Sequence, residues 1–228
     1  MAMFDHTYCY ANKESYKLLN PNETMKSFKI STSRVFAYIK KIIPRPELKI
    51  AGRYLLQYQC ELYNLVYNVI HNYSVAEPLK DPNAFLTTSY DKLMDALNIK
   101  ERYTPTDIQF TKDVWGPIYW NFLHLLSILC NKEEQKKTFA YIMMNFNLVL
   151  MCSACAFNFR SKKPFMLTMS MLITGDVITN LYNFHNLVNK ALHKPYFDYS
   201  DFLDTYKLRK VESEVVDTSI LFVSLITK

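Results

Sequence analysis

The 228-residue sequence contains only three glycines, Gly52, Gly116 and Gly175. They lie too far apart to form a G-x-G-x-x-G turn or a P-loop, the two glycine-rich loops that commonly hold phosphate groups. Nucleotide-binding folds built on those loops are therefore excluded. A nucleotide cofactor would have to bind by other means, for example between packed helices.

The sequence also lacks a hydrophobic run long enough to cross a membrane. The longest segment without charge extends from Thr138 to Phe159, but polar residues divide it into apolar runs far shorter than the ~20 residues that a bilayer requires. The first ten residues lack the basic and apolar regions of a secretory signal. We therefore expect a soluble, intracellular protein with no membrane span.

Charge of one sign is not concentrated in any segment. The net charge is +6, and the lysine pairs at 40–41, 136–137 and 162–163 are isolated. Nucleic-acid-binding domains gather their basic residues into a patch or stripe, whereas dispersed pairs are typical of solvated helix faces. We expect no nucleic-acid partner.

Cysteine is sparse and odd in number: Cys9, Cys60, Cys130, Cys152 and Cys155. This set is not the disulfide framework of a small secreted domain. It fits an intracellular protein in which one pair is catalytic and the other thiols are buried or free. With half of the residues hydrophobic and 15% aromatic, the chain has ample material for a folded core.

Apolar residues recur at three and four along most of the chain, which predicts an all-α protein. In the first half we expect helices over 31–42, 47–72 and 82–97. A turn-like stretch at 103–107 separates this half from the rest. We therefore divide the chain into a helical N-terminal domain, 1–105, and a second helical domain, 106–228. The second domain should contain helices over 115–130, 133–150, 152–160, 176–194 and 197–206, with an apolar connector at 164–175.

Gly116, Trp120 and His124 are each four residues apart and share one face of the helix over 115–130. Gly116 would allow a flat ligand to approach the backbone, Trp120 offers a broad π-face, and His124 offers a ring nitrogen. A core helix whose Trp and His are simply packed explains the same residues.

Cys152 and Cys155 form a C-x-x-C pair, which occurs as a redox dithiol, as half of a zinc site, or as two buried thiols. At a helix N-terminus the free N–H groups would stabilise a thiolate. Zinc needs four ligands, and without a second C-x-x-C only scattered histidines such as His185 and His193 remain. We therefore favour redox chemistry and expect no metal.

Polar residues also occupy a helix face that should be buried. His185, Val188 and Asn189 share this face, with Asn186 beside them. Buried polar groups are costly without hydrogen bonds, and an adenine or ribose edge could supply them. Lys194 follows near the helix end, where a cation could meet a phosphate.

Three segments thus occur in order: Trp115–His124 (WGPIYWNFLH), Cys152–Cys155 (CSAC) and His185–Tyr196 (HNLVNKALHKPY). They resemble the Erv/ALR family of FAD-dependent sulfhydryl oxidases, whose pattern is W-G-x-x-x-W-x-x-x-H, C-x-x-C and H-N-x-V-N-x-x-L-x-K-P. The resemblance implies a small helical bundle that holds FAD. Protein thiols would reduce the C-x-x-C disulfide, which reduces the flavin, and O2 would reoxidise the flavin to give H2O2.

The resemblance also implies residue roles. Cys152 would be attacked by substrate, and Cys155 would lie next to the flavin. Residues expected to contact FAD are Gly116, Trp120, His124, Cys155, His185, Asn186, Val188, Asn189, Lys194 and Tyr196. Family bundles pair through their first helices, so we expect a homodimer.

Several features depart from the family pattern. Pro117 follows the motif glycine where members commonly have Arg or Ser, and Leu181 and Tyr182 precede His-Asn where many have Trp. The stapling cysteines of cellular members are absent. The chain looks most like the divergent viral members, namely the baculoviral sulfhydryl oxidase and its relatives, whose N-terminal half binds no FAD. A viral member would act in the host cytoplasm or nucleus and in the virion. Two alternatives are an inactive flavin-binding structural subunit and a zinc-stabilised interaction module.

Overall fold

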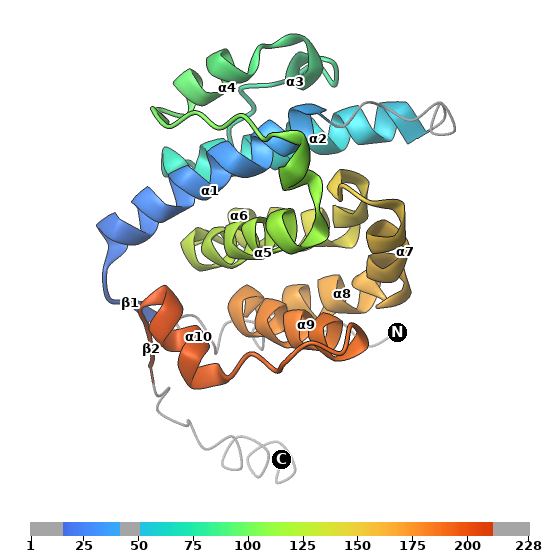
Figure 1. Cartoon of the computed structure of the whole chain (residues 1–228). Helices are drawn as coiled ribbons and strands as arrows, with labels where there is room; N and C mark the ends of the chain where they lie inside the picture. Colours follow the sequence, from blue (N-terminus) through green and yellow to red (C-terminus); the bar gives the residue numbers. More distant parts are fainter. Residues whose placement is uncertain (1–15, 42–50, 212–228) are drawn as a thin grey trace, which may run out of the picture.

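The computed structural model describes residues 16–41 and 51–211, and helices dominate in these parts of the chain (Figure 1). Six longer helices stack in three layers: α1 (Pro21–Lys41) with α2 (Ala51–Ile70), α5 (Lys112–Leu129) with α6 (Glu133–Met144), and α8 (Pro164–Thr174) with α9 (Val177–Ala191). The predicted all-α class is confirmed.

Shorter elements connect and flank the layers. They are α3 (Ala84–Thr87), α4 (Tyr90–Ala96), α7 (Ser153–Ser161), α10 (Tyr199–Tyr206) and the 3-10 turns η3 (Asp107–Phe110) and η4 (Phe146–Val149). A small antiparallel ribbon of β1 (Tyr16–Leu18) and β2 (Leu208–Lys210) pairs Leu18 with Leu208. The hydroxyl of Tyr16 lies 2.6 Å from that of Thr179, which attaches the ribbon to the start of α9.

The first helix begins well before the predicted start at Ser31. Proline suits the first helical position, and α1 begins at Pro21. Ser31, Thr32 and Ser33 lie buried in the middle of α1 instead of capping it. Ser31 accepts a hydrogen bond from the Asn121 amide at 2.6 Å, so its hydroxyl group serves a contact between α1 and α5. The prolines expected to end this helix lie outside the described residues.

The predicted connector at 164–175 is wrong, because this segment forms α8. Pro164 occupies its first turn, and Gly175 ends it in the left-handed region with φ of 67°. Helical periodicity could not be recognised because no charged residue marks a solvent face. One face packs on α6, where the Thr168 hydroxyl donates to the Ala140 carbonyl at 2.9 Å.

The hydrophobic core is continuous between the N-terminal and C-terminal halves. Phe28 and Phe36 of α1 pack on Phe122 of α5, with ring centroids 5.8 and 6.3 Å apart. The Tyr58 hydroxyl of α2 donates to the Ile142 carbonyl of α6 at 3.0 Å. The layer of α1 and α2 thus covers one face of α5 and α6 (Figure 1).

Candidate active site between α5, α7 and α9

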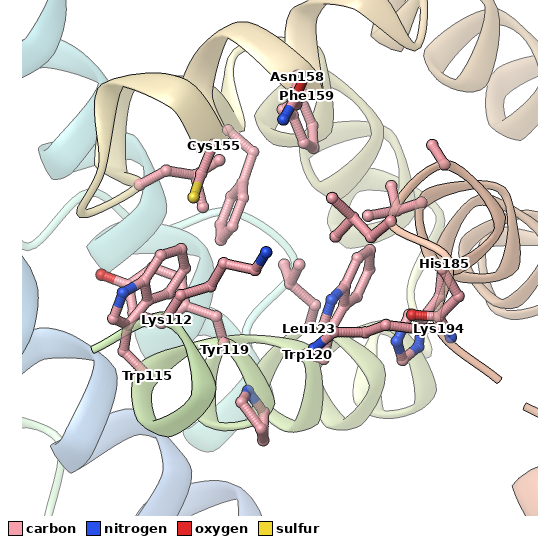
Figure 2. Close-up of a pocket in the computed structure, with 18 of the residues that line it drawn as sticks. Lys112, Trp115, Tyr119, Trp120, Leu123, Cys155, Asn158, Phe159, His185 and Lys194 are labelled. Atoms are coloured by element: carbon pink, nitrogen blue, oxygen red, sulfur yellow. The ribbon is translucent and has the colours of Figure 1, made fainter. Parts of the chain in front are cut away.

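A cavity of about 450 Å³ lies between α5, α7 and α9 (Figure 2). Its volume falls within the roughly 300–1,000 Å³ typical of ligand sites. Aromatic and aliphatic side chains form most of its wall. Among them are Trp115, Tyr119, Trp120, Leu123, Phe146, Phe159 and Val188. Such walls suit a flat, largely apolar ligand.

The C-x-x-C pair lies at one end of this cavity. Cys152 and Cys155 form a disulfide, with Cα atoms 5.2 Å apart. Cys152 is the N-cap of α7, and its Sγ accepts a hydrogen bond from the Cys155 N–H at 3.1 Å. Cys155 lines the cavity and its sulfur points inward (Figure 2), whereas Cys152 is not among the lining residues. The two sulfurs therefore differ in their access to the cavity, and only Sγ of Cys155 would lie next to a ligand bound there.

The remaining described cysteines are far less reactive. Cys60 and Cys130 are both buried and free, and burial raises the pKa of each thiol. The Cys60 thiol donates to the Asp81 carbonyl at 3.2 Å. Cys9 lies outside the described residues. Within 16–41 and 51–211, the Cys152–Cys155 pair is therefore the redox-active candidate.

Two histidines meet at the opposite end. His124 is fully buried, and its Nε2 lies 2.9 Å from Nδ1 of His185, which lines the cavity. The Trp120 ring stacks on His185 with centroids 3.9 Å apart. Burial, with a smaller effect of Lys194, lowers the pKa of His185 to about 4. Burial, with a smaller effect of repulsion between the two rings when both are protonated, holds the pKa of His124 well below its usual value. Both rings are therefore neutral at pH 7.

The end of α9 places Lys194 at the cavity. His193 adopts the left-handed conformation with φ of 53°. Its N–H donates to the Lys190 carbonyl at 3.2 Å, and the Lys194 N–H donates to the Asn189 carbonyl at 2.9 Å. This pair of bonds is a Schellman motif, which turns the chain back after the helix. The Asn189 side chain is buried and lines the cavity beside Lys194.

The structure brings most of the predicted site residues to the cavity. Those that line it are Gly116, Trp120, Cys155, His185, Val188, Asn189 and Lys194. His124 lies behind His185. A side chain at Gly116 would meet no other atom within 4 Å, so this position is open to a ligand. Contact of these residues with a cofactor stays a prediction.

Asn186 and Tyr196 do not line the cavity. The Asn186 amide donates to the Phe197 carbonyl at 3.0 Å and accepts from the Phe197 N–H at 2.9 Å. Its polar groups are thus paired within the chain, contrary to the expectation that they need a ligand. Tyr196 is 63% exposed, and its hydroxyl accepts a hydrogen bond from Tyr182 at 3.2 Å. The predicted contacts of both residues with FAD remain untested.

Sequence reasoning missed several lining residues, including Lys112, Asn158, Phe159 and Lys162. Helical spacing could have found three of them. Lys112 lies one turn before Gly116, whereas Asn158 and Phe159 lie one turn after Cys155. Lys162 lies beyond the end of α7, where helical spacing no longer predicts which residues share a face.

The charge of the cavity has one sign. Lys112, Lys162 and Lys194 line it, and no Asp or Glu does so among the residues that the structure describes. The cavity therefore favours an anionic ligand. Flat aromatic walls, lysines at both ends and a disulfide at one end fit a flavin nucleotide in shape and charge.

Two further observations bear on the alternatives. Within the described ranges, no group of three or more His, Cys, Asp or Glu residues could hold a metal ion. No helix of the described chain is long and apolar enough to cross a membrane.

Comparison with known proteins gives one family match and several relatives, each over part of the chain. Residues 117–207 match the model of the Erv1/Alr family. Two relatives are FAD-linked sulfhydryl oxidases of African swine fever virus, from a Kenyan pig isolate and a Malawian tick isolate. They are 33% and 32% identical to the chain over 100 residues, which cover 41% of the chain and 80% of each relative. No solved structure matches the chain.

Proposed function

The chain belongs to the Erv1/Alr family, and we propose that it is an FAD-linked sulfhydryl oxidase that forms disulfide bonds in other proteins. The observation that carries this proposal is the Cys152–Cys155 disulfide with one sulfur on a lysine-rich aromatic cavity. The viral relatives bear the name of this activity. The family resemblance read from the three motifs is confirmed, and these relatives are viral, as the departures from the pattern indicated.

The lining residues suggest how FAD is held. Trp115, Tyr119 and Phe159 offer flat walls near Cys155, whereas Trp120 and His185 offer them at the far end. Asn189 and Lys194 supply hydrogen bonds and charge there. Pro117 has no side-chain hydrogen-bond donor at the position where family members commonly have Arg or Ser. Lys112, one turn before Gly116, brings a positive charge to the same cavity. FAD held by these residues would supply a two-electron acceptor that O2 can reoxidise, with H2O2 as the product.

The chain's own residues perform the thiol chemistry. A substrate thiolate attacks Sγ of Cys152, the Cys152–Cys155 bond breaks, and its electron pair stays on Cys155. A second substrate thiolate attacks the mixed disulfide, which releases the oxidised substrate and a Cys152 thiol. Cys155 lies in the first turn of α7, where the positive end of the helix dipole stabilises its thiolate. Return of this thiol–thiolate pair to a disulfide releases two electrons and one proton. Ionisation of the two substrate thiols, less the proton taken up by Cys152, supplies the second proton, so two electrons and two protons balance the reduction of O2 to H2O2.

The halves of the chain differ in role. Every lining residue that the structure describes lies between 112 and 206, so the described part of the proposed N-terminal domain, 1–105, contributes none. We assign residues 1–105 a structural role without FAD. Action in the host cytoplasm or nucleus and in the virion stays a prediction.

The proposed homodimer must use a face other than that of the first family helices. In this chain α1 and α2 already cover α5 and α6. The outer face of α8 instead presents Phe165, Met166, Met169 and Ile173 to solvent. With Phe157 of the neighbouring α7, they expose on the order of 500 Å² of apolar surface, so two copies would bury about 1,000 Å², enough for a specific interface. We place the dimer contact there.

Absorption spectra and oxygen consumption test the proposed activity. The purified protein should show a flavin spectrum, consume O2 with a dithiol and release H2O2. Cys152→Ser and Cys155→Ser should each abolish turnover, while the flavin remains bound. A folded protein that cannot be loaded with FAD would refute the proposal. Loading without turnover would support the inactive structural subunit.

A further inference from the structure

His124 does not adjoin the cavity, although it lies beside a residue that does. Its side chain is fully buried, and the Nε2···Nδ1 contact with His185 is its only side-chain hydrogen bond to the described residues. The other ring nitrogen of His124, Nδ1, is buried and has no partner. The rings of Phe202 and Tyr206 lie 5.3 and 5.2 Å from that of His124 and enclose it.

The contact between two neutral imidazoles allows two proton arrangements. In one, His124 donates from Nε2, and the unpartnered Nδ1 is a bare acceptor. In the other, His185 donates from Nδ1, and His124 buries an N–H without an acceptor. A buried N–H without a partner is the rarer arrangement in folded proteins, so the first is favoured.

The first arrangement determines what His185 offers to a ligand. Its Nδ1 then accepts from His124, and its proton must lie on Nε2, the ring nitrogen left for the cavity. Trp120, stacked on His185 with planes 12° apart, fixes the plane of the ring. The tautomer of His185 is thus set by His124 from outside the cavity, and the plane of its ring by Trp120 in the cavity wall.

We infer that His124 is a positioning residue, which holds His185 as an Nε2–H donor toward an acceptor atom of the bound nucleotide. This inference rests on the proposed FAD site. The structure favours it over direct contact with FAD, because His185 and Trp120 line the cavity and His124 does not.

The test compares two replacements of similar size in the FAD-loaded, full-length protein. His124→Gln can still donate to Nδ1 of His185, whereas His124→Met cannot. We expect His124→Met to raise the FAD dissociation constant about tenfold, as expected for the loss of one hydrogen bond, and His124→Gln to stay within about threefold of the wild type. The constant is measured by flavin fluorescence on dilution. Tyr54→Phe, at an exposed position of α2 off the cavity, serves as the control and should change nothing.

Nitrogen NMR of the wild type reads the tautomer directly. With 15N-labelled histidine, which occurs five times in the chain, His185 should show a protonated Nε2 at pH 7. A protonated Nδ1 would overturn the inference even if both variants failed to fold. So would equal FAD affinity of the Gln and Met variants, which indicates a purely structural role. Absence of oxidase turnover in the wild type would instead count against the proposed function, and the tautomer measurement does not depend on it.

Discussion

The Trp120 indole lies flat on the His185 imidazole, with ring centroids 3.9 Å apart and planes within 12° of parallel. The two rings come from α5 and α9 and close the far end of the cavity together (Figure 2). Neither ring is held there by its own helix alone. The ligand wall at this end is therefore a product of the packing between α5 and α9.

Replacement of Trp120 by Leu should weaken FAD binding about tenfold, because an aromatic pair contributes about 0.5–1.5 kcal/mol beyond its buried area. Trp120→Phe retains a ring and should lose less. Dilution of the flavin-loaded variants, followed by fluorescence, measures both. Equal losses for Leu and Phe would show that the stack does not hold the cofactor.

Lower pH should destabilise the folded protein through His124 and His185. Their pKa values are lowered on folding, to about 4 for His185, so below pH 6.5 the unfolded chain binds protons that the folded chain rejects. This stabilisation is fully present above pH 6.5 and is lost as pH falls. For His185 the loss is about 2 kcal/mol between pH 7 and pH 5.

Thermal denaturation across that pH range measures the loss as a falling Tm. His185→Asn should flatten the dependence, whereas the control Tyr54→Phe, on the exposed side of α2, should leave it unchanged. A wild-type Tm that stays constant between pH 7 and pH 5 would contradict the low pKa of the pair.

Asn186 and Asn189 should respond differently to replacement by alanine. Asn186→Ala removes the partner of the Phe197 N–H, whereas the Phe197 carbonyl keeps its bond from the Tyr182 hydroxyl, and the change should lower the free energy of unfolding by about 1–3 kcal/mol. Asn189 makes no side-chain hydrogen bond to the described residues, so Asn189→Ala should mainly raise the FAD dissociation constant. Denaturation and flavin titration of both variants separate the two roles. If the two replacements weaken FAD binding equally, the prediction that Asn186 contacts FAD directly would be supported instead.

The proposed dimer contact predicts that a charge on α8 separates the subunits. Met169→Lys places an ammonium group in the middle of the exposed apolar face and should yield a monomer at micromolar concentration. Sedimentation measures the change. Tyr54→Lys, on the exposed side of α2, should remain a dimer. A monomeric wild type would exclude this contact.

Several residues that the sequence singles out as site candidates line the cavity. Gly116, Trp120 and Cys155 were recognised because helical spacing and a short motif determine their relation locally. The meeting of His124 with His185 depends on how α5 packs against α9, which no local pattern encodes. Asn186 shows the same limit, since its partner Phe197 lies in a segment without regular structure.

Two misread segments show how local patterns fail. Residues 31–33 look like a helix cap, but inside α1 the hydroxyl groups of Ser31 and Ser33 make tertiary contacts instead. Residues 164–174 of α8 include no charged side chain, so no polar face reveals the helical periodicity of this segment. The β1–β2 ribbon joins the two ends of the described chain, and such a long-range pairing cannot be read from three residues on each side.

Substrate thiols should reduce the Cys152–Cys155 disulfide directly, without an internal relay. A relay needs a second dithiol whose Cα atoms approach within roughly 7 Å and then reach Cys152. Cys60 and Cys130 are buried with raised thiol pKa values, so neither forms a thiolate readily. A variant with Cys9, Cys60 and Cys130 all changed to Ser should therefore retain FAD and most of its turnover on a reduced protein, measured by oxygen consumption. If this variant folds and binds FAD but oxidises only small dithiols, one of the three cysteines carries electrons from protein substrates, and direct attack on Cys152 is wrong.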